Sequence, residues 1–391
     1  MEYAMNALPS HTEIIIVGAG PSGLALAAEL RRLGAMPLLL DRQAEGANTS
    51  RAAVVHAQTL EVLTPLGATA AVLEEGVKVP IFRIHDRDKV LMEIDFSGLD
   101  TPYPFTIMCP QNRTEAILLD RLRALGGEVL RPVEVIAVEA QSSGIDVTVK
   151  RDGRSDAIRT NWLVGCDGAH SVVRDAAGVA FEGGAYEESF VLADVRMDWP
   201  LSREEVSLFF SPAGLVVVAP LPDERYRIVA TIDKAPEHPD IAFLQRILDT
   251  RGPASTGSTI QEIVWSSRFH LQHRVTATPR AGRILLCGDA AHVHSPAGGQ
   301  GMNTGIQDAV SLAQPLLDAV HGGATTALDA WASRRHKIAQ NVVAMTDRMT
   351  RAATLRSAPA RLLRNTALEI AGHIPGIPAR LARLLAELDN R

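Results

Sequence analysis

The segment EIIIVGAGPSGLALAAELRRLGAMPLLLDRQ, residues 13–43, has the pattern of a strand, a tight turn, a helix and a second strand. Its β-branched run Ile14–Val17 ends at Gly18, and apolar residues then recur at helical spacing. A second apolar run, Leu38–Leu40, ends at Asp41. This order predicts a β-α-β unit with an acidic residue at the tip of its second strand, which commits this part of the chain to an α/β fold.

Each glycine of the turn has a physical task in such a unit. Gly18 permits the sharp turn, Gly20 lets the main chain approach a pyrophosphate, and Gly23 lets the helix pack closely on the strand. The helix N-terminus supplies free N–H groups and partial positive charge, and Asp41 can accept hydrogen bonds from a ribose. A glycine-rich turn alone can be merely a turn, but together with the strand, the helix and the acid it predicts a dinucleotide site, for NAD or for FAD.

Two further apolar strands each end in glycine and aspartate. LVGCDGAHSVVR lies near the middle of the chain and contains Asp167, and ILLCGDAAH contains Asp289. We expect a nicotinamide-dependent dehydrogenase to complete its cofactor site within the first half of its chain. The two later strand ends therefore favour FAD over NAD as the bound cofactor.

In this order the three segments resemble the flavin fingerprint, the Asp-Gly motif and the Gly-Asp motif of the single-component FAD-dependent aromatic hydroxylases, the para-hydroxybenzoate hydroxylase-like family of flavoprotein monooxygenases. The resemblance runs from residue 11 to about residue 350 and includes SRAAVVHAQTLEVL, TPYPFTIMCPQNRTEAILLDRL and GGQGMNTGIQDA. In length the chain resembles members of this family that lack a C-terminal thioredoxin-like domain.

The resemblance implies roles for residues within these motifs. It places Asp289 at the ribityl chain of FAD and Asp167 near the pyrophosphate; the alternatives are a helix N-cap for Asp289 and a simple turn at Asp167. Arg51 and Gln111 match positions that contact FAD phosphate and ribityl groups, and Arg42 would help to bind NADPH or NADH transiently. The cofactor-binding residues predicted in this way are Gly18, Gly20, Gly23, Asp41, Arg42, Arg51, Gln111, Asp167, Asp289, Pro296, Gly299, Gly301, Met302 and Asn303.

The loop SPAGGQGMN would pass the isoalloxazine ring, because its glycines allow the main chain to approach a ligand closely. The helix that begins near Asn303 would point its N-terminus at the N1 and C2 carbonyl edge, where reduction places negative charge. A helix N-terminus stabilises an anion by about 0.3–1 kcal/mol, and by up to about 2 kcal/mol when it is partly buried. The alternative interpretation of the loop is a flexible connector. Pro315 is expected to kink or end this helix.

Short apolar runs joined by turn residues occupy residues 79–103 and 183–275 and predict a mainly antiparallel sheet. By the resemblance, this sheet forms the wall of a substrate cavity over the flavin. The candidate cavity residues are Phe209, Val218, Pro220 and His294. Ordinary core packing is the alternative for the apolar ones.

The resemblance also implies the domain organisation. A Rossmann-like FAD-binding domain is interrupted by the sheet, so the fold class is α/β with an α+β elaboration and C-terminal helices. The predicted domains are the FAD-binding domain of residues 11–78, 104–182 and 276–325, the substrate-binding sheet of residues 79–103 and 183–275, and the C-terminal helical region of residues 326–391.

The activity that the resemblance implies is hydroxylation of a phenolic or related aromatic substrate by O₂ and NADPH or NADH, through a C4a-hydroperoxyflavin. Such chemistry requires a closed and mainly apolar cavity that keeps water out. The alternatives are an FAD-dependent halogenase or other flavin oxidoreductase, and a non-enzymatic relative of the fold. The Trp-x-Trp-x-x-Pro stretch of the halogenases is absent, and the flavin loop is intact. The sequence identifies no catalytic acid or base and no particular substrate.

Charge and apolar patterning restrict the expected partners. A net charge of −6 and an isoelectric point near 6.1 give no broad basic surface, so nucleic acid is not an expected partner. No apolar run reaches the roughly 18 residues of a membrane span, and the start of the chain does not resemble a secretion signal. The C-terminal helices are candidates for a homodimer contact.

Cysteine and histidine spacing predicts neither a disulfide nor a metal site. Cys109, Cys166 and Cys287 are isolated in sequence, and no pair has CxxC spacing. Reduced and buried thiols are therefore expected, which suits the cytoplasm. His292 and His294 have no third ligand at a sensible spacing. We expect His292 to pack and hydrogen-bond beneath the flavin loop, and His294 to face the cavity.

Overall fold

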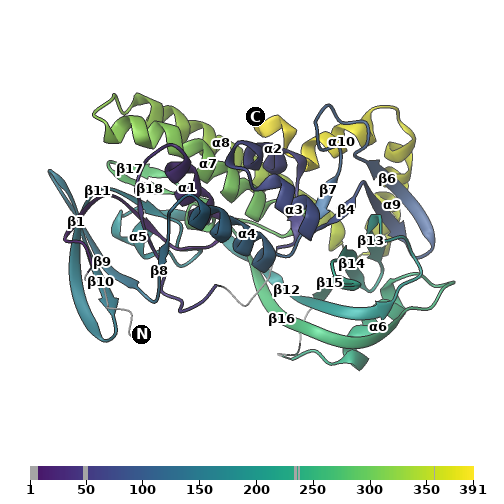
Figure 1. Ribbon diagram of the computed structural model, residues 1–391. Coiled ribbons are helices and arrows are strands. Elements are labelled where there is room, and N and C mark those ends of the chain that lie inside the picture. The colour runs from purple at the N-terminus through teal and green to yellow at the C-terminus, as the bar shows by residue number, and fades with distance from the viewer. Residues whose placement is uncertain (1–7, 47–51, 233–235, 237, 356) are drawn as a thin grey trace.

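The computed structural model describes residues 8–391 apart from 47–51, 233–235, 237 and 356. Figure 1 shows a left-hand part and a right-hand part, each built on its own large sheet. Helices from the C-terminal half of the chain lie along the top of both parts in this view.

The sheet of the left-hand part contains the predicted β-α-β unit. Its strands are β1 (His11–Val17), β2 (Leu38–Leu40), β8 (Val129–Leu130), β9 (Glu134–Gln141), β10 (Gly144–Arg151), β11 (Arg154–Gly165), β17 (Arg280–Ala281) and β18 (Ile284–Leu286). They are arranged in the order β17-β18-β11-β1-β2-β8, and β10 and β9 continue from β11. The four pairings from β18 through β11, β1 and β2 to β8 are parallel. The ends of β1, β11 and β18 therefore meet at one edge of the sheet.

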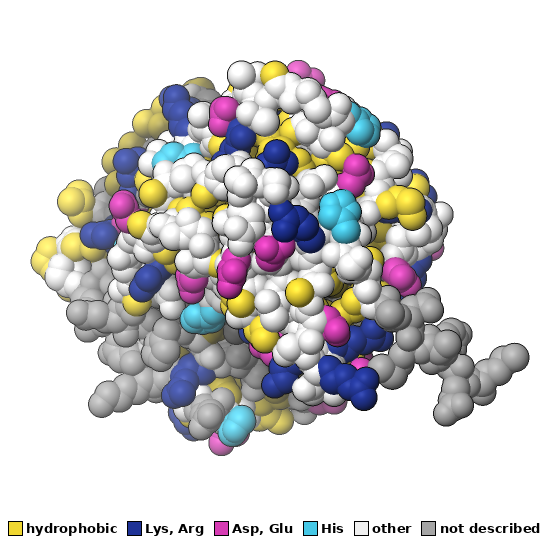
Figure 2. Space-filling model, turned by 90° about the vertical axis from the view of Figure 1, so that its left-hand side faces the viewer, with side chains coloured by type: hydrophobic (Ala, Val, Ile, Leu, Met, Phe, Trp, Pro, Cys, Tyr) yellow, Lys and Arg dark blue, Asp and Glu magenta, His cyan; other side chains and the backbone are white. Residues whose placement is uncertain are grey.

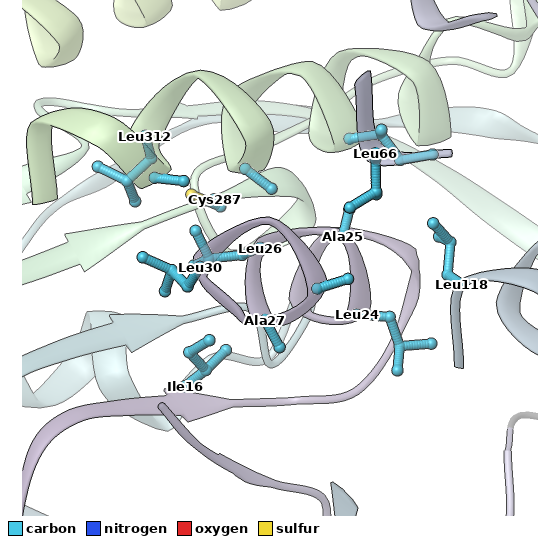
Figure 3. Packing of buried hydrophobic residues seen from close by; sticks show 14 of the residues in the cluster. Ile16, Leu24, Ala25, Leu26, Ala27, Leu30, Leu66, Leu118, Cys287 and Leu312 are labelled. Atoms are coloured by element: carbon cyan, nitrogen blue, oxygen red, sulfur yellow. The ribbon is translucent and has the colours of Figure 1, made fainter. Parts of the chain in front are cut away.

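Helices pack around this sheet. They are α1 (Pro21–Arg32), α2 (Ala57–Leu66), α3 (Thr69–Glu75), α4 (Gln111–Ala124), α5 (Val172–Ala176), α7 (Gly301–Val320) and α8 (Thr326–Ala353). On the outer surface of this part, acidic and basic side chains are interspersed, as Figure 2 shows. Figure 3 shows α1 between β1 and α7, with Ile16 on the sheet side and Leu312 on the α7 side. Alanines on both flanks of α1 permit this close packing, because they add little bulk.

The second sheet forms most of the right-hand part. Its strands are β5 (Ile81–Asp86), β6 (Lys89–Asp95), β12 (Phe181–Asp198), β13 (Glu205–Ser211), β14 (Gly214–Leu221), β15 (Arg225–Ile232), β16 (Thr259–Thr276) and β19 (His292–Val293). They are arranged in the order β19-β16-β12-β15-β14-β13-β5-β6, and among these pairings only β13–β5 is parallel within the described residues. The helix α6 (Ile241–Arg251) covers one face of this sheet with Leu244 and Leu248.

A small sheet links the two parts. It consists of β3 (Val54–Val55), β7 (Thr106–Met108) and β4 (Val77–Val79), in the order β3-β7-β4. Val79 and Met108 pack with the face of the second sheet that α6 does not cover. That face is therefore turned toward the first part of the molecule.

The C-terminal helices pack on the edge of the second sheet. They are α9 (Ala358–His373), α10 (Ile377–Leu385) and the short 3₁₀ helix η3 (Leu388–Asn390). An ideal Cβ at Gly372 would lie 3.1 Å from the carbonyl oxygen of Leu91, so the end of α9 lies close to the edge strand β6. Two further 3₁₀ helices, η1 (Gly288–Ala290) and η2 (Ala297–Gly299), lie between β18 and α7.

The predicted fold class is confirmed: a parallel, Rossmann-like sheet is interrupted in sequence by a mainly antiparallel one, with helices at the C-terminal end. The exact domain boundaries stay a prediction. The helix does not end at Pro315, which was one of the two expected outcomes, because α7 continues through it to Val320; a kink at this residue stays a prediction. Leu312 and Leu316 are fully buried on either side of the proline, and this packing holds the helix together despite one lost N–H donor. None of the described helices is both long enough and apolar enough to cross a membrane.

Candidate functional site

The turn between β1 and α1 is packed so tightly that two of its glycines have no room for a side chain. Gly18 has a φ of +98°, and an ideal Cβ there would lie 2.3 Å from the carbonyl oxygen of Cys166. A Cβ at Gly23 would lie 1.9 Å from the carbonyl oxygen of Gly18. The protein's own backbone therefore requires both glycines.

Gly20 differs, because nothing in the described protein crowds it. Its φ is −75°, which every residue can adopt, and no described atom lies within 4 Å of an ideal Cβ. Gly20 is also the N-cap of α1, and no side chain among the described residues caps this helix. An open space at an uncapped helix N-terminus fits a pyrophosphate, which needs close backbone approach and free N–H donors.

Asp41 and Arg131 lie on the other side of the turn. The Oδ2 atom of Asp41 accepts a hydrogen bond from Ala19 N at 2.6 Å, and its Oδ1 accepts one from Gln43 N at 2.7 Å. Arg131 follows β8, lies 3.9 Å from Asp41 and donates to the Ala19 carbonyl at 3.3 Å. Its buried Nε has no hydrogen-bond partner among the described residues. Arg131 was not among the predicted site residues, and its orphaned donor beside the turn fits a phosphate or ribose oxygen.

Asp167 lies between β11 and α5, where its carboxylate caps the turn. Its Oδ1 accepts a hydrogen bond from Ser171 Oγ at 2.5 Å, and its Oδ2 accepts one from Val173 N at 3.2 Å. Burial raises the pKa of Asp167, and these hydrogen bonds offset that rise in part. The structural turn considered as an alternative is therefore present, and contact between Asp167 and the cofactor stays a prediction.

Asp289 lies in η1 at the tip of β18, and it is exposed. The preceding Gly288 has a φ of +59°, and a Cβ there would lie 2.5 Å from Oγ of Ser22 on α1. A Cβ at Gly305 on α7 would lie 2.5 Å from the same oxygen. The starts of α1 and α7 therefore meet at the tip of β18, beside Asp289.

Val54 and Asn303 contact the turn at residues 296–300 and hold its conformation. An ideal Cβ at Gly299 would lie 2.8 Å from the Cβ of Val54 on β3. The buried Asn303 donates through Nδ2 to the carbonyl oxygens of Val54 and Gly299, at 2.8 Å each, and its Oδ1 accepts from His56 N at 2.9 Å. These contacts hold the turn against β3. Both the amide nitrogen and the amide oxygen of Asn303 are therefore hydrogen-bonded within the protein.

The helix α7 begins at Gly301, slightly before the expected start near Asn303. Its N-cap is Gln300, and within the described part of the chain no side chain caps it. Its first turn also lacks an acidic residue. Met302 is buried and Pro296 is exposed. The start of α7 therefore offers N–H groups and partial positive charge, which suit the negatively charged edge of a reduced flavin.

His292 belongs to a buried network beneath this turn. Its Nε2 lies 2.6 Å from Oδ2 of Asp308, and Nε of Arg335 lies 2.5 Å from the other carboxylate oxygen. Burial works to raise the pKa of Asp308, but Arg335 and His292 hold it below its ordinary value. The network joins β19, α7 and α8. Among the described residues, no group of three or more His, Cys, Asp or Glu side chains is arranged to hold a metal ion.

His294 presents a neutral acceptor beside the start of α7. Its Nδ1 lies 2.9 Å from the carbonyl oxygen of Ser295, so Nδ1 carries the proton and donates it. Burial lowers the pKa of His294 to about 4, which leaves the ring neutral at pH 7. Its buried Nε2 has no partner in the described part of the protein and would lie 3.7 Å from a Cβ at Gly301. This nitrogen can accept a hydrogen bond from a hydroxyl group.

Three other predicted cofactor residues remain predictions. Gln111, at the start of α4, accepts a hydrogen bond from Ala52 N at 3.3 Å and donates to Glu115 at 2.9 Å. Arg42 is exposed after β2. Arg51 lies outside the described residues.

The predicted cavity residues on the second sheet lie on its α6 face. Phe209 on β13 and Val218 on β14 are fully buried in the cluster that contains Leu244 of α6. Pro220 follows Val218 by two positions and is also buried, on the same face of β14. Phe209 and Val218 therefore belong to the core packing beneath α6, which was the alternative interpretation.

The opposite face of the same strands lies toward the turn at residues 296–300. Leu208, Leu215 and Val217 are partly buried there, in one cluster with Val54. Val54 in turn contacts Gly299. Leu208 and Val217, each next to a predicted cavity residue in sequence, therefore lie on the face of the sheet that shares a cluster with Val54.

Comparison with known proteins agrees with this site. The family described as "FAD binding domain" matches residues 11–346. The chain is 38% identical over 354 residues to the 6-methylpretetramide 4-monooxygenase of Streptomyces rimosus, a match that covers 89% of this chain and 63% of that protein. The chain therefore spans less than two thirds of the length of this relative.

Solved structures have the same architecture. The anhydrotetracycline hydroxylase OxyS from Streptomyces rimosus superposes with a TM-score of 0.82 at 33% identity, covering 97% of this chain and 76% of that one. The p-nitrophenol 4-monooxygenase PnpA from Pseudomonas putida has a TM-score of 0.86 at 23% identity, covering 97% and 98%, and shares the fold. With its glycine turn, its strand ends and the start of α7 inside the matched region, the chain belongs to the family of FAD-dependent aromatic hydroxylases.

Proposed function

We propose that this chain is a monooxygenase that uses FAD, NADPH or NADH, and O₂ to hydroxylate a phenolic or related aromatic compound. The observation that carries the proposal is the meeting of two uncapped helix starts, those of α1 and α7, at the tip of β18. Relatives at 33% and 38% identity are named as a hydroxylase and a monooxygenase, which supports the same reaction class.

The described residues would hold FAD along the edge where β1, β11 and β18 end. Gly20 and the start of α1 would bind the pyrophosphate, and Asp41 with Arg131 would bind the adenosine side. Asp289 would bind the ribityl chain, and the start of α7 would face the ring edge that becomes negative on reduction. Bound FAD supplies the two-electron exchange with NAD(P)H and the reaction with O₂ that the protein's side chains cannot perform.

The second sheet would keep water from the reacting atoms. Leu208, Leu215 and Val217 present an apolar surface on the side of Val54 and the turn at residues 296–300. An apolar wall lowers the local dielectric and excludes water, which otherwise diverts activated oxygen to hydrogen peroxide. This wall would also bind the flat face of an aromatic substrate.

His294 would orient the substrate hydroxyl. Its proton is on Nδ1, and its buried Nε2 is an acceptor beside Gly301. A phenolic O–H could donate to Nε2, which would hold the ring in one orientation and help to draw the proton away. Arg42, exposed after β2, would contribute to transient binding of NADPH or NADH.

We also propose a homodimer, a cytoplasmic location and no role for nucleic acid. The homodimer is supported by α9, where Leu362, Leu363 and Ile370 are more than half exposed. On the left-hand side of the molecule, which Figure 2 shows, acidic and basic side chains are interspersed without a basic stripe, which argues against nucleic acid. Free thiols at Cys109, Cys166 and Cys287, all within the described part, suit a reducing compartment. Sedimentation equilibrium of the purified protein would test the dimer.

Turnover with a panel of aromatic compounds tests the proposed activity. The purified protein is supplied with FAD, and NADPH and NADH oxidation is followed with anhydrotetracycline, p-nitrophenol and simple phenols. The proposal expects at least one compound to accelerate NAD(P)H oxidation and to gain one oxygen atom by mass spectrometry. Oxidation that yields only hydrogen peroxide with every compound would contradict it.

A further inference from the structure

The segment of residues 377–391 lies directly against the glycine turn. Gln300 donates through Nε2 to the carbonyl oxygen of Leu385 at 3.1 Å, and Gln58 N donates to that of Ala386 at 3.2 Å. An ideal Cβ at Gly298 would lie 3.1 Å from a methyl group of Leu385. This segment, far away in sequence, therefore forms part of the support beneath residues 296–300.

Glu387 is a buried polar residue of this segment, and its side chain lies among other polar groups. It has a φ of +60°, which is uncommon for a residue other than glycine, and it is only 2% exposed. Its carboxyl group is hydrogen-bonded by Gln307 Nε2, and it accepts from Thr304 Oγ1 at 3.3 Å. The unusual backbone conformation turns a carboxyl group, a costly group to bury, toward the first turns of α7.

The two partners of Glu387 belong to the part of α7 that follows the turn. Thr304 is one residue after Asn303, whose amide holds Gly299. Gln307, one turn further on, also donates to Thr59 Oγ1 of α2 at 3.1 Å. The carboxyl group therefore ties the segment of residues 377–391 to α7, and Gln307 extends this connection to α2.

We propose that Glu387 is a positioning residue: its carboxyl group fixes the start of α7 and thereby the conformation of the turn at residues 296–300. The inference rests on the proposed function only in taking that turn to bind FAD. Glu387 itself would touch neither FAD nor substrate, and its effect passes through Thr304 and Gln307.

The protonation state of Glu387 controls how well the carboxyl group can do this. Burial raises the pKa of Glu387 to about 8, although Gln307, Arg335 and Thr304 act in the opposite direction. The charged groups that act on it from the neighbouring helices are Arg335 of α8 and Asp308 of α7. At pH 7 the carboxyl group is therefore mainly neutral. Above pH 8 it carries a charge in a buried place, which favours opening of the contact.

Hydrogen exchange of the FAD-free protein tests the positioning without any bound group. At pH 7, Glu387→Ala should accelerate exchange of the amides of residues 298–304 by about tenfold or more, because local opening becomes easier. Glu387→Gln keeps the shape of the neutral carboxyl: its amide oxygen can accept from Gln307, and its NH₂ group can donate to Thr304 Oγ1, whose own proton can go to the Gln300 carbonyl. Exchange should therefore stay at the wild-type rate. The matched control is Asp389→Ala, an exposed carboxylate of the same segment that pairs with Arg383. Equal exchange in wild type and Glu387→Ala would overturn the proposal.

FAD titration at two pH values tests the link to ionisation. If only the neutral form supports the turn, wild-type affinity for FAD should fall by about tenfold between pH 7 and pH 9, since pH 9 is one unit above the pKa. Glu387→Gln should keep its affinity, and Asp389→Ala should follow wild type. The same loss in wild type and Glu387→Gln would overturn the proposal while leaving the proposed function intact. Absence of FAD binding in all variants would instead contradict the proposed function, and the exchange experiment would still decide the role of Glu387.

Discussion

Gly299 lies directly against Val54, so that an added Cβ would come within 2.8 Å of both Cβ and Cγ2 of the valine. The φ of +67° at Gly299 also lies in the left-handed region, which costs another residue about 1–2 kcal/mol. Both the contact with Val54 and the left-handed φ therefore disfavour a side chain at Gly299.

Gly299→Ala should therefore weaken FAD retention, lower the flavin reduction potential and raise the yield of hydrogen peroxide per NAD(P)H consumed. The displaced turn would move the start of α7 away from the negative edge of the reduced ring. Dye equilibration measures the potential, and a peroxide assay measures the yield. Adding Val54→Ala removes the contact with the valine Cγ atoms, but it leaves the contact with Cβ and the backbone strain, so it should restore FAD retention only in part. Wild-type potential and peroxide yield in a folded Gly299→Ala variant would show that the turn is only a connector.

The buried pair of Asp308 and Arg335 should contribute far more to stability than an exposed pair of the same kind. Asp308→Asn leaves Arg335 and His292 without a charged partner in the core, and we expect a loss of about 3–5 kcal/mol in the free energy of unfolding. The control Asp329→Asn breaks an exposed ion pair with Arg280 and should cost less than about 1 kcal/mol. Urea unfolding of both variants measures the difference, and equal losses would be incompatible with this reading of the network.

The stability of the protein should fall as pH rises toward 8 because of Glu387. Its pKa in the folded protein, about 8, lies above the ordinary value of 4.5, so the folded state binds the proton more tightly than the unfolded state. The resulting stabilisation is fully present below pH 4.5, is lost progressively between pH 4.5 and 8, and is absent above pH 8. The slope from this group cannot exceed about 1.4 kcal/mol per pH unit. Urea unfolding of wild type should show this slope relative to Glu387→Gln, and parallel pH profiles would contradict it.

Reductant should leave folding and activity unchanged. Cys109, Cys166 and Cys287, all in the described part of the chain, are free thiols in the structure. Loss of a native disulfide would cost about 2–5 kcal/mol, which a thermal melt with and without dithiothreitol would detect easily. A marked drop in melting temperature with dithiothreitol would reveal a disulfide that the structure does not show.

Features formed by residues that lie close together in the sequence could be predicted from it. The run Ile14–Val17, the turn at Gly18 and the acid at Asp41 all lie within one short segment, so their pattern is visible without the fold. Asp167 and Asp289 follow apolar runs in the same way, and the structure brings these strand ends to one edge. Because parallel strands end at the same edge of a sheet, the convergence of these residues could be predicted.

The faces of the second sheet could not be predicted, because both are apolar. Phe209 and Val218 lie under α6, whereas Leu208 and Val217 lie toward the turn. The alternation of side chains along a strand identifies which residues share a face. It shows which face is buried only when the other face is polar. In the runs VSLFF and GLVVVAPL that contrast is missing, because a helix covers one side and the other part of the molecule covers the opposite one.

Arg131 and Glu387 were missed because their roles depend on long-range contacts. Arg131 follows a strand of two residues, too short to give a pattern. Glu387 lies in the polar stretch AELDNR, which is typical of an exposed chain segment, and only its packing against Gln307 and Thr304 shows otherwise. Polar residues of this kind give no periodic signal that distinguishes a buried position from a solvated one.

The occupancy of FAD in wild type and in Gly20→Val is the most direct test of the central claim, that the turn between β1 and α1 holds the cofactor. A Cβ at Gly20 would have no described protein atom within 4 Å, and the position needs no unusual φ, so we expect Gly20→Val to preserve folding to within about 1 kcal/mol. The side chain would instead fill the space proposed for the pyrophosphate. We predict a wild-type protein with the visible spectrum of bound flavin and a folded Gly20→Val variant without it. Full FAD occupancy in the folded Gly20→Val variant would contradict the account.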